Sequence, residues 1–223
     1  MAAPVDLETA ITQLQVALGS YPEEGDPAEW AWLHIRLGDA YRKRLYGEES
    51  TNLEMALRSY LAALRVYMPD TYPNAWAKTQ MRLGIVYFNR ILGDEAENIE
   101  AAIYAYEAAL TVYRREDTPA EWATTHYNLG SAYLSRLVGD RVVNLHAAVS
   151  SYEAALEVFT REIYPVENER VLEYIGVAER YLAQYENEDA VDQAVYAYHS
   201  AMMAANPMAM SGVWLKPTYA PER

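Results

Sequence analysis

Pro119-Ala-Glu-Trp-Ala-Thr-Thr-His-Tyr-Asn-Leu-Gly-Ser-Ala-Tyr133 is the stretch that decides the fold, because related stretches occur four times in the chain. Its proline and its glycine recur every 46 residues, at Pro27, Pro73, Pro119 and Pro165 and at Gly38, Gly84, Gly130 and Gly176. Tyrosines keep the same step, at Tyr60, Tyr106, Tyr152 and Tyr198. A fixed period of this size, with no insertion between copies, indicates a stacked repeat architecture.

The period divides the chain into units, each of which we expect to contain two helices, an A-type helix followed by a B-type helix. We predict a single all-α array over residues 1–206, with a half repeat at 5–26 and full repeats at 27–72, 73–118, 119–164 and 165–206. The half repeat supplies only a B-type helix. We predict a non-helical tail over residues 207–223, which contain Pro207, Pro217 and Pro221.

Capping residues predict the helix bounds. Asp26-Pro27-Ala28-Glu29 has the capping-box arrangement, so an A-type helix is expected to begin at each repeat proline. These helices are expected to end at Gly47, Gly93 and Gly139, where glycine readily adopts a left-handed C-cap. We expect Asn52, Asn98 and Asn144 to cap the B-type helices.

A glycine inside a helix costs about 1 kcal/mol relative to alanine. Gly38 and its three equivalents therefore need a packing reason, and we predict that a neighbouring helix backbone passes too close for a Cβ atom. The fourth repeat differs from the others, with Asn168, Glu179 and Tyr185 in place of the repeat tryptophan, tyrosine and loop glycine. Terminal repeats are often atypical in this way.

The amino-acid composition limits the classes of function that the chain can have. The chain has 223 residues, 52% of them hydrophobic, so a sizeable core is expected. The absence of cysteine excludes disulfides and thiol catalysis. A net charge of −14 argues against nucleic-acid binding, which needs clustered cations. The N-terminus resembles no signal peptide and no apolar run could span a membrane, so we expect a cytoplasmic protein that does not bind membranes.

Leu37-Gly38-x-x-Tyr41 followed by Ala56-x-x-x-Tyr60 resembles the tetratricopeptide repeat, and the same pattern returns at Leu83 and Leu129. The resemblance covers nearly the whole chain except the tail, with a period of 46 rather than the usual 34. It implies helix pairs stacked into a right-handed superhelical solenoid, with the A-type helices lining a concave groove.

This long variant is similar to repeats of large bacterial signalling proteins, where such arrays sit beside protease or nucleotide-switch domains. One branch of the tetratricopeptide family grips chaperone C-termini with Lys and Asn on the groove face. The corresponding positions here are occupied by Ile35, Asp39, Arg82, Thr124 and Asn128. Only Asn128 fits, so that mode of binding is not expected.

The sequence contains no catalytic constellation, so we predict a protein that is not an enzyme and needs no cofactor or metal. His34 and His126 share one repeat position, two units apart, which favours packing over metal binding or catalysis. Trp30, Trp76 and Trp122 also share a position, and core packing is favoured for them over ligand stacking.

We predict a scaffold that binds a protein or peptide in the groove. The first two A-type helices concentrate cations, which favours an extended acidic segment, and apolar groups beside them offer anchors. An equal alternative is that the arginines pair with the acidic loops at Glu48-Glu49 and Asp94-Glu95. The predicted groove residues are Arg36, Arg42, Lys78, Met81, Arg82, Phe88, Tyr127 and Asn128.

Two other function classes stay open at this point. One is a self-assembling structural module, a homo-oligomer formed through the array ends or the tail, whose Met208, Val213, Trp214 and Leu215 we expect to pack against the array. The other is a sensor or regulatory domain of a bacterial signalling system.

Overall fold

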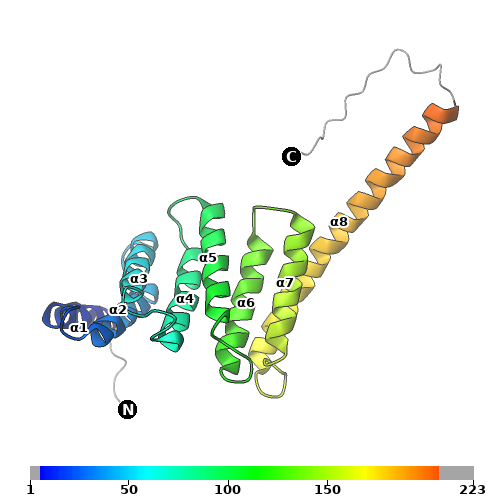
Figure 1. Ribbon diagram of the computed structural model, residues 1–223. Helices are drawn as coiled ribbons and strands as arrows, with labels where there is room; N and C mark the ends of the chain where they lie inside the picture. The colour runs from blue at the N-terminus through cyan, green and yellow to red at the C-terminus, as the bar shows by residue number, and fades with distance from the viewer. Residues whose placement is uncertain (1–5, 206–223) are drawn as a thin grey trace. The chain divides into compact units, whose positions relative to one another are not determined.

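Helices account for all the regular structure in residues 6–205, the part of the chain that the computed structural model describes (Figure 1). They are α1 (Leu7–Ser20), α2 (Pro27–Arg42), α3 (Glu49–Ala63), α4 (Pro73–Phe88), α5 (Glu95–Leu110), α6 (Pro119–Ser135), α7 (Arg141–Leu156) and α8 (Pro165–Ala205). The predicted all-α class is therefore confirmed. Helices α2, α4 and α6 are A-type, and α1, α3, α5 and α7 are B-type.

Each helix up to α7 packs against the next one along the chain, as expected for stacked repeats (Figure 1). The chain divides into two units after Glu179, and all the packing described below belongs to the first. Residues 165–179 of α8 continue this packing, since Val171 and Tyr174 join the cluster around Tyr152 and Phe159.

The helix starts follow their prolines. Pro27, Pro73, Pro119 and Pro165 are each the first helical residue, and the Asp26 carboxylate accepts a hydrogen bond from the Glu29 amide at 3.1 Å. The predicted ends were wrong, because α2, α4 and α6 stop before the loop glycines. These glycines do have positive φ, at 80°, 89° and 83°, but within the connection to the B-type helix rather than at the C-cap.

The B-type helices are also capped differently from the prediction. Asp94 and Asp140 cap α5 and α7, accepting bonds from the backbone amides of Glu97 and Val143 at 2.9 Å. The asparagines predicted as caps lie inside the first turn and are buried, at Asn52, Asn98 and Asn144. The side-chain amides of these asparagines instead donate hydrogen bonds to backbone carbonyls of the preceding loops, as described below.

The helix glycines make room for a tyrosine ring. A Cβ atom on Gly84 would lie 2.4 Å from Cε1 of Tyr106, and one on Gly38 would lie 2.5 Å from Cε1 of Tyr60. At Gly38 and Gly84 the closest neighbour is thus a side chain of the paired B-type helix and not its backbone as predicted, whereas at Gly130 the backbone carbonyl of Ala148 is also close, at 3.1 Å. Because these tyrosines are 0–1% exposed, each ring is a central core element of its repeat.

The fourth repeat departs from the predicted helix pair, because α8 is one helix from Pro165 to Ala205. The signals that end and restart helices in the earlier repeats are missing. Tyr185 stands at the position of the loop glycine, and Ala190 at the position of the buried asparagine. With neither residue present, nothing interrupts the helical hydrogen bonds between the two halves.

Within residues 6–205, no helix combines the length and the apolar character that crossing a bilayer requires. The tail residues expected to pack on the array, Met208, Val213, Trp214 and Leu215, lie outside the described residues.

Candidate functional site

One face of the A-type helices is open and carries two cavities. The first lies between α1 and α2, has a volume of about 510 Å³ and includes Arg36, Asp39 and Lys43 in its lining. The second, of about 320 Å³, is lined at the equivalent positions of later repeats by Ile85, Asn89, Asn128, Ser131, Ser135 and Tyr174. These positions differ from those in the first cavity by one, two or three steps of 46. We call this surface the A-face.

The second cavity brings together three of the eight residues predicted for the groove. Phe88, Tyr127 and Asn128 line it, with Phe88 coming from α4 and the other two from α6. Tyr106 of α5 and Tyr174 of α8 complete its aromatic lining. A cavity lined by residues of three consecutive repeats is what an extended ligand would need in order to contact several units.

Aromatic rings stack around one end of this cavity. The ring centroids of Tyr127, Tyr152 and Tyr174 lie 5.8–5.9 Å apart in all three pairings. Such distances are typical of favourable aromatic pairs, which hold the rings in place. Burial, together with the neighbouring Tyr174, raises the pKa of Tyr127, so its hydroxyl stays protonated at neutral pH.

The hydroxyl of Tyr106 lacks the partner that its equivalents have. The Tyr60 hydroxyl donates to Asp39 at 2.7 Å, and the Tyr152 hydroxyl donates to Ser131 at 3.1 Å. In the middle repeat, Ile85 takes the position that Asp39 and Ser131 have in the other two, and its side chain cannot accept a hydrogen bond. The structure describes no hydrogen bond from the Tyr106 hydroxyl to any residue in the range 6–205. Burial raises the pKa of this tyrosine, so it remains a donor.

Arg42 lies within electrostatic range of Tyr106, because its positive charge opposes the rise in the pKa of that tyrosine. Its side chain is half-buried, and its Nε has no hydrogen-bond partner among the residues that the structure describes. The second cavity is thus lined by one tyrosine hydroxyl without a described acceptor, and the positive charge of Arg42 acts on that tyrosine.

Arg82 is bound to Asp39 and is therefore not a free cation. Its Nε and Nη2 lie 2.7 and 2.9 Å from the two carboxylate oxygens of Asp39. Burial alone would raise the pKa of Asp39, but the hydrogen bonds and charge of Arg82 outweigh it and hold that pKa below its usual value. The pair links α2 to α4 across neighbouring repeats.

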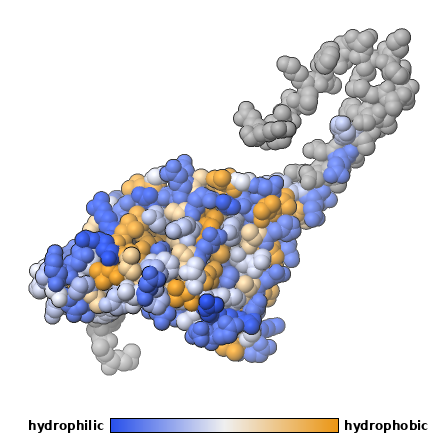
Figure 2. Space-filling view, in the orientation of Figure 1, coloured by the Kyte–Doolittle hydropathy of each residue, from blue (hydrophilic) through white to orange (hydrophobic). Residues whose placement is uncertain are grey.

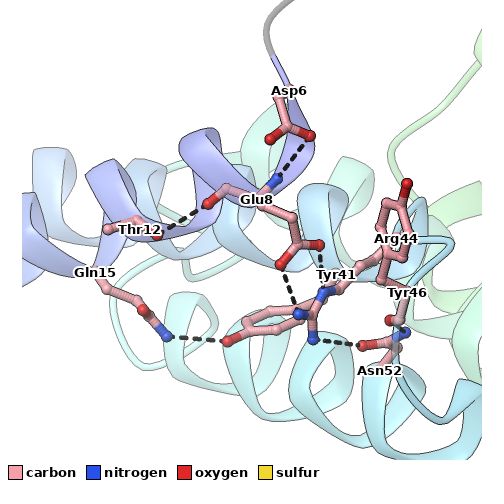
Figure 3. Close-up of polar contacts among 8 residues, drawn as sticks. All are labelled: Asp6, Glu8, Thr12, Gln15, Tyr41, Arg44, Tyr46 and Asn52. Atoms are coloured by element: carbon pink, nitrogen blue, oxygen red, sulfur yellow. Dashed lines mark hydrogen bonds and ion pairs between the residues drawn. The ribbon is translucent and has the colours of Figure 1, made fainter.

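Three further arginines form a recurring contact that sequence reasoning missed, and Figure 3 shows the one around Arg44. Arg44 donates to both oxygens of Glu8, at 2.7 and 2.6 Å, and to Asn52 at 3.4 Å. The Asn52 amide in turn donates to the carbonyl of Tyr46 at 2.9 Å. We call each such set a clasp, and the three clasps are Glu8–Arg44–Asn52, Glu54–Arg90–Asn98 and Glu100–Arg136–Asn144.

The clasps contradict the alternative in which these arginines pair with the acidic loops. Arg90 binds Glu54 of the preceding B-type helix, at 2.6 and 3.2 Å, rather than the loop at Asp94-Glu95. The signal was available in the sequence, since an Arg follows each Glu by 36 residues and precedes each Asn by 8. The fourth repeat has His146, Leu182 and Ala190 at these positions, so no clasp can form there.

The remaining predicted groove residues lie apart from the second cavity. Arg36 is exposed, with its guanidinium 5.1 Å from the Trp32 ring centroid, and it lines the first cavity. Lys78 is exposed one turn before Arg82. Met81 packs against the core cluster of Ile99 and Leu129. The structure therefore separates the predicted cations from the aromatic cavity, and Arg42 lines another cavity beside Arg44 and Asn52.

The two histidines pack against tryptophans within their own helices. The rings of Trp30 and His34 lie 4.2 Å apart edge to face, and those of Trp122 and His126 lie 4.4 Å apart. Burial lowers the pKa of both histidines, which favours neutral imidazoles. No group of three potential metal ligands occurs among the residues described.

Apolar exposure by itself does not mark a site on this chain. Figure 2 shows hydrophobic side chains interspersed with hydrophilic ones over the array. Leu45 and Tyr104, exposed by 91% and 72%, line none of the cavities on the A-face.

Comparison with known protein families and with curated proteins finds no match for this chain.

Proposed function

We propose that the chain is a non-enzymatic scaffold that binds an acidic peptide segment on its A-face, in the manner of a tetratricopeptide domain. The observation that carries the proposal is the second cavity, where the Tyr106 hydroxyl has no described acceptor and lies beside an aromatic lining, with the positive charge of Arg42 acting on that tyrosine. A cytoplasmic setting is part of the proposal.

The cavity suits one large apolar side chain of a peptide. Its volume of about 320 Å³ is at the lower end of the range of about 300–1,000 Å³ found for small-molecule pockets. Phe88 and Tyr127 provide the apolar walls, and rigid aromatic pockets of this kind commonly hold the anchor residues of an interface. The peptide backbone then follows the A-face toward neighbouring repeats.

A carboxylate next to that anchor would accept a hydrogen bond from the Tyr106 hydroxyl. In the first repeat the tyrosine hydroxyl donates to the carboxylate of Asp39, so a ligand oxygen near Tyr106 would reproduce an arrangement already present in the fold. Arg42 supplies a positive charge for the same group, and hydrogen bonds between charged partners are the stronger ones. Lys78 and Arg36, both exposed, are placed to attract further acidic residues.

The test begins with selection of peptides from a random phage-displayed library on the immobilised chain. The most enriched sequence is then synthesised with a fluorescein label, and its Kd is measured by anisotropy at low and high NaCl. We expect enriched peptides that combine acidic residues with a large apolar one, and binding that weakens with salt. Tyr106→Phe keeps the ring on Gly84 and removes only the hydroxyl, so it should weaken binding by about tenfold.

Tyr60→Phe is the matched control, because its hydroxyl already has a partner and does not line the second cavity. It should lower thermal stability while leaving the Kd unchanged. Arg42→Gln should weaken binding as Tyr106→Phe does. The proposal is wrong if no peptide is enriched, or if the selected peptide binds Tyr106→Phe and Arg42→Gln as tightly as it binds the unaltered chain.

A further inference from the structure

Helix α1 exposes a face that the fold covers in every later B-type helix. In α3 the residues Leu53, Ala56, Tyr60 and Ala63 are 0–6% exposed, because α2 packs over them. The residues 46 positions earlier are Leu7, Ala10, Leu14 and Ala17. These four are only half-buried and line the cavity of about 510 Å³. The repeat itself shows what belongs there, namely an A-type helix.

Within the described part of the first unit, no other residue covers the B-facing side of the A-type helix that residues 165–179 of α8 form. A Cβ atom on Gly176 would meet nothing within 4 Å, whereas its equivalents in the three earlier repeats each meet a tyrosine ring. Leu172 nearby is 52% exposed. An interior helix glycine is unfavourable by about 1 kcal/mol unless something packs closely on it.

Residues 165–179 and the lining of the cavity beside α1 carry opposite net charge. Residues 165–179 carry four exposed glutamates, Glu167, Glu169, Glu173 and Glu179, against one arginine, Arg170. The cavity beside α1 has Arg36 and Lys43 in its lining, both exposed, while its single carboxylate, Asp39, is bound by Arg82. Glu173 stands at the repeat position of Tyr127, whose ring lies 5.8 Å from that of Tyr174, and Arg36 stands at the repeat position of Tyr174, so Glu173 is the carboxylate expected to face Arg36.

We propose that copies of this chain associate head to tail, with residues 165–179 of α8 in one copy packing on α1 of the next. Among the described residues of the first unit, α1 is a B-type helix with no A-type helix before it, and residues 165–179 form an A-type helix with no B-type helix after it. Together they complete one composite repeat, with Leu14 of one copy over Gly176 of the other.

The contact cannot form within a single array, because three full helix pairs separate α1 from α8 and each helix packs against its neighbours in sequence. Such an interface is heterologous, so the same step can be repeated and the mass should grow with concentration. This inference is independent of peptide binding at the second cavity.

Cysteine cross-linking tests the register directly, since the chain has no cysteine of its own. A Cβ atom on Gly130 would lie 3.1 Å from the carbonyl oxygen of Ala148, and the same pair in the composite repeat is Gly176 and Ala10. The double variant Gly176→Cys with Ala10→Cys should form disulfide-linked multimers under mild oxidation. The control pair, Gly176→Cys with Val16→Cys, should stay monomeric on a non-reducing gel, because Val16 is 66% exposed away from this face.

Sedimentation velocity supplies the second readout. The unaltered chain should show a mass that rises with concentration and falls with added NaCl. Gly176→Trp fills open space in the single chain, so the melting temperature should be retained while association is lost. A constant mass at all concentrations, association that survives Gly176→Trp, or equal cross-linking of the control pair would each overturn the proposal.

Discussion

Arg90, just after the end of α4, binds Glu54 of α3 through two guanidinium nitrogens, and Arg136 binds Glu100 in the same way 46 residues further on. Each of these arginines also donates a hydrogen bond to an asparagine, whose amide in turn donates to a backbone carbonyl of the loop that follows the arginine. The conformation of every A-to-B connection is thus coupled to the repeat before it.

Asn98→Ala should lower the free energy of unfolding by about 1–3 kcal/mol, because it leaves the carbonyl of Leu92 and one nitrogen of Arg90 without partners. Asn98 is 5% exposed, so water cannot replace these bonds easily. Chemical denaturation measures the change. Asn74→Ala, at an exposed position in α4, is the control and should change stability by less than about 0.5 kcal/mol. Equal effects of the two variants would contradict a structural role for the clasp.

Two glycines at one repeat position should respond to alanine in opposite directions. Gly84→Ala places a Cβ atom 2.4 Å from the Tyr106 ring, and overpacking of this kind costs about 1–3 kcal/mol. Gly176→Ala meets open space, so the better helix propensity of alanine should stabilise the chain by up to about 1 kcal/mol. Denaturation should be measured at a concentration where the protein has the mass of a single chain. A stabilising Gly84→Ala would show that the ring can move aside.

Stability should fall as the pH drops from about 7.5 to about 5.5, through the usual histidine pKa of about 6.5. Burial lowers the pKa of His34 and His126 in the folded chain, so the unfolded state binds protons first and gains stability in acid. The charges that act on these groups are Arg65 on His34, which lowers its pKa further, and Glu157 on His126, which opposes the shift.

The double variant His34→Gln with His126→Gln should reduce this pH dependence, and glutamine already occupies the equivalent position at Gln80. The measurement is the difference in melting temperature between the two pH values, for the variant and the unaltered chain. Asp39, Glu8 and Glu100 have lowered pKa values, so their contributions are lost only below the carboxylate range of about 4. An unchanged pH dependence in the double variant would assign the effect to other groups.

Restoring the missing loop signals should divide α8 into two helices. The variant replaces residues 184–190 with the sequence of residues 92–98 and adds Leu182→Arg and His146→Glu, which completes a fourth clasp. Amide hydrogen exchange over residues 184–190 should become faster, because helical hydrogen bonds are lost where the new loop forms. A version that keeps Leu182 and His146 is the comparison, and it should form a less protected loop. Unchanged exchange in the full variant would mean that other contacts keep α8 continuous.

The sequence predicted the repeat, the helix starts and the crowding at the helix glycines, because these depend on contacts within one unit. The Asp26-Pro27 start and the approach between Gly38 and Tyr60 follow from local pattern and from the period. The fourth repeat was mistaken because the period was given more weight than Tyr185, a local sign that the turn is lost.

The candidate site was predicted only in part. Phe88, Tyr127 and Asn128 do line one cavity, since neighbouring repeat positions must lie on one face. Arg82 was mistaken for a free cation because its partner, Asp39, lies 43 residues away on the preceding A-type helix. Pairing of that kind depends on the offset between stacked repeats, which the period alone does not reveal. Replacing Arg36 and Arg82 together by Glu would therefore also remove the hydrogen-bond partner of Asp39. Loss of binding in that variant could come from this structural change, so it would not identify the groove as the binding site.

The direction of the clasps bears on how the chain assembles during synthesis. In every clasp the glutamate comes from the earlier repeat, and the arginine and asparagine come from the later one. A growing chain emerges from its N-terminus, so each new arginine meets a carboxylate that is already in place on a folded helix. In each of the three clasps, the earlier B-type helix thus presents the carboxylate that positions the next A-to-B loop. Glu8 does this for the loop of the first full repeat, so α1 contributes to the folding of that repeat as well as to its packing.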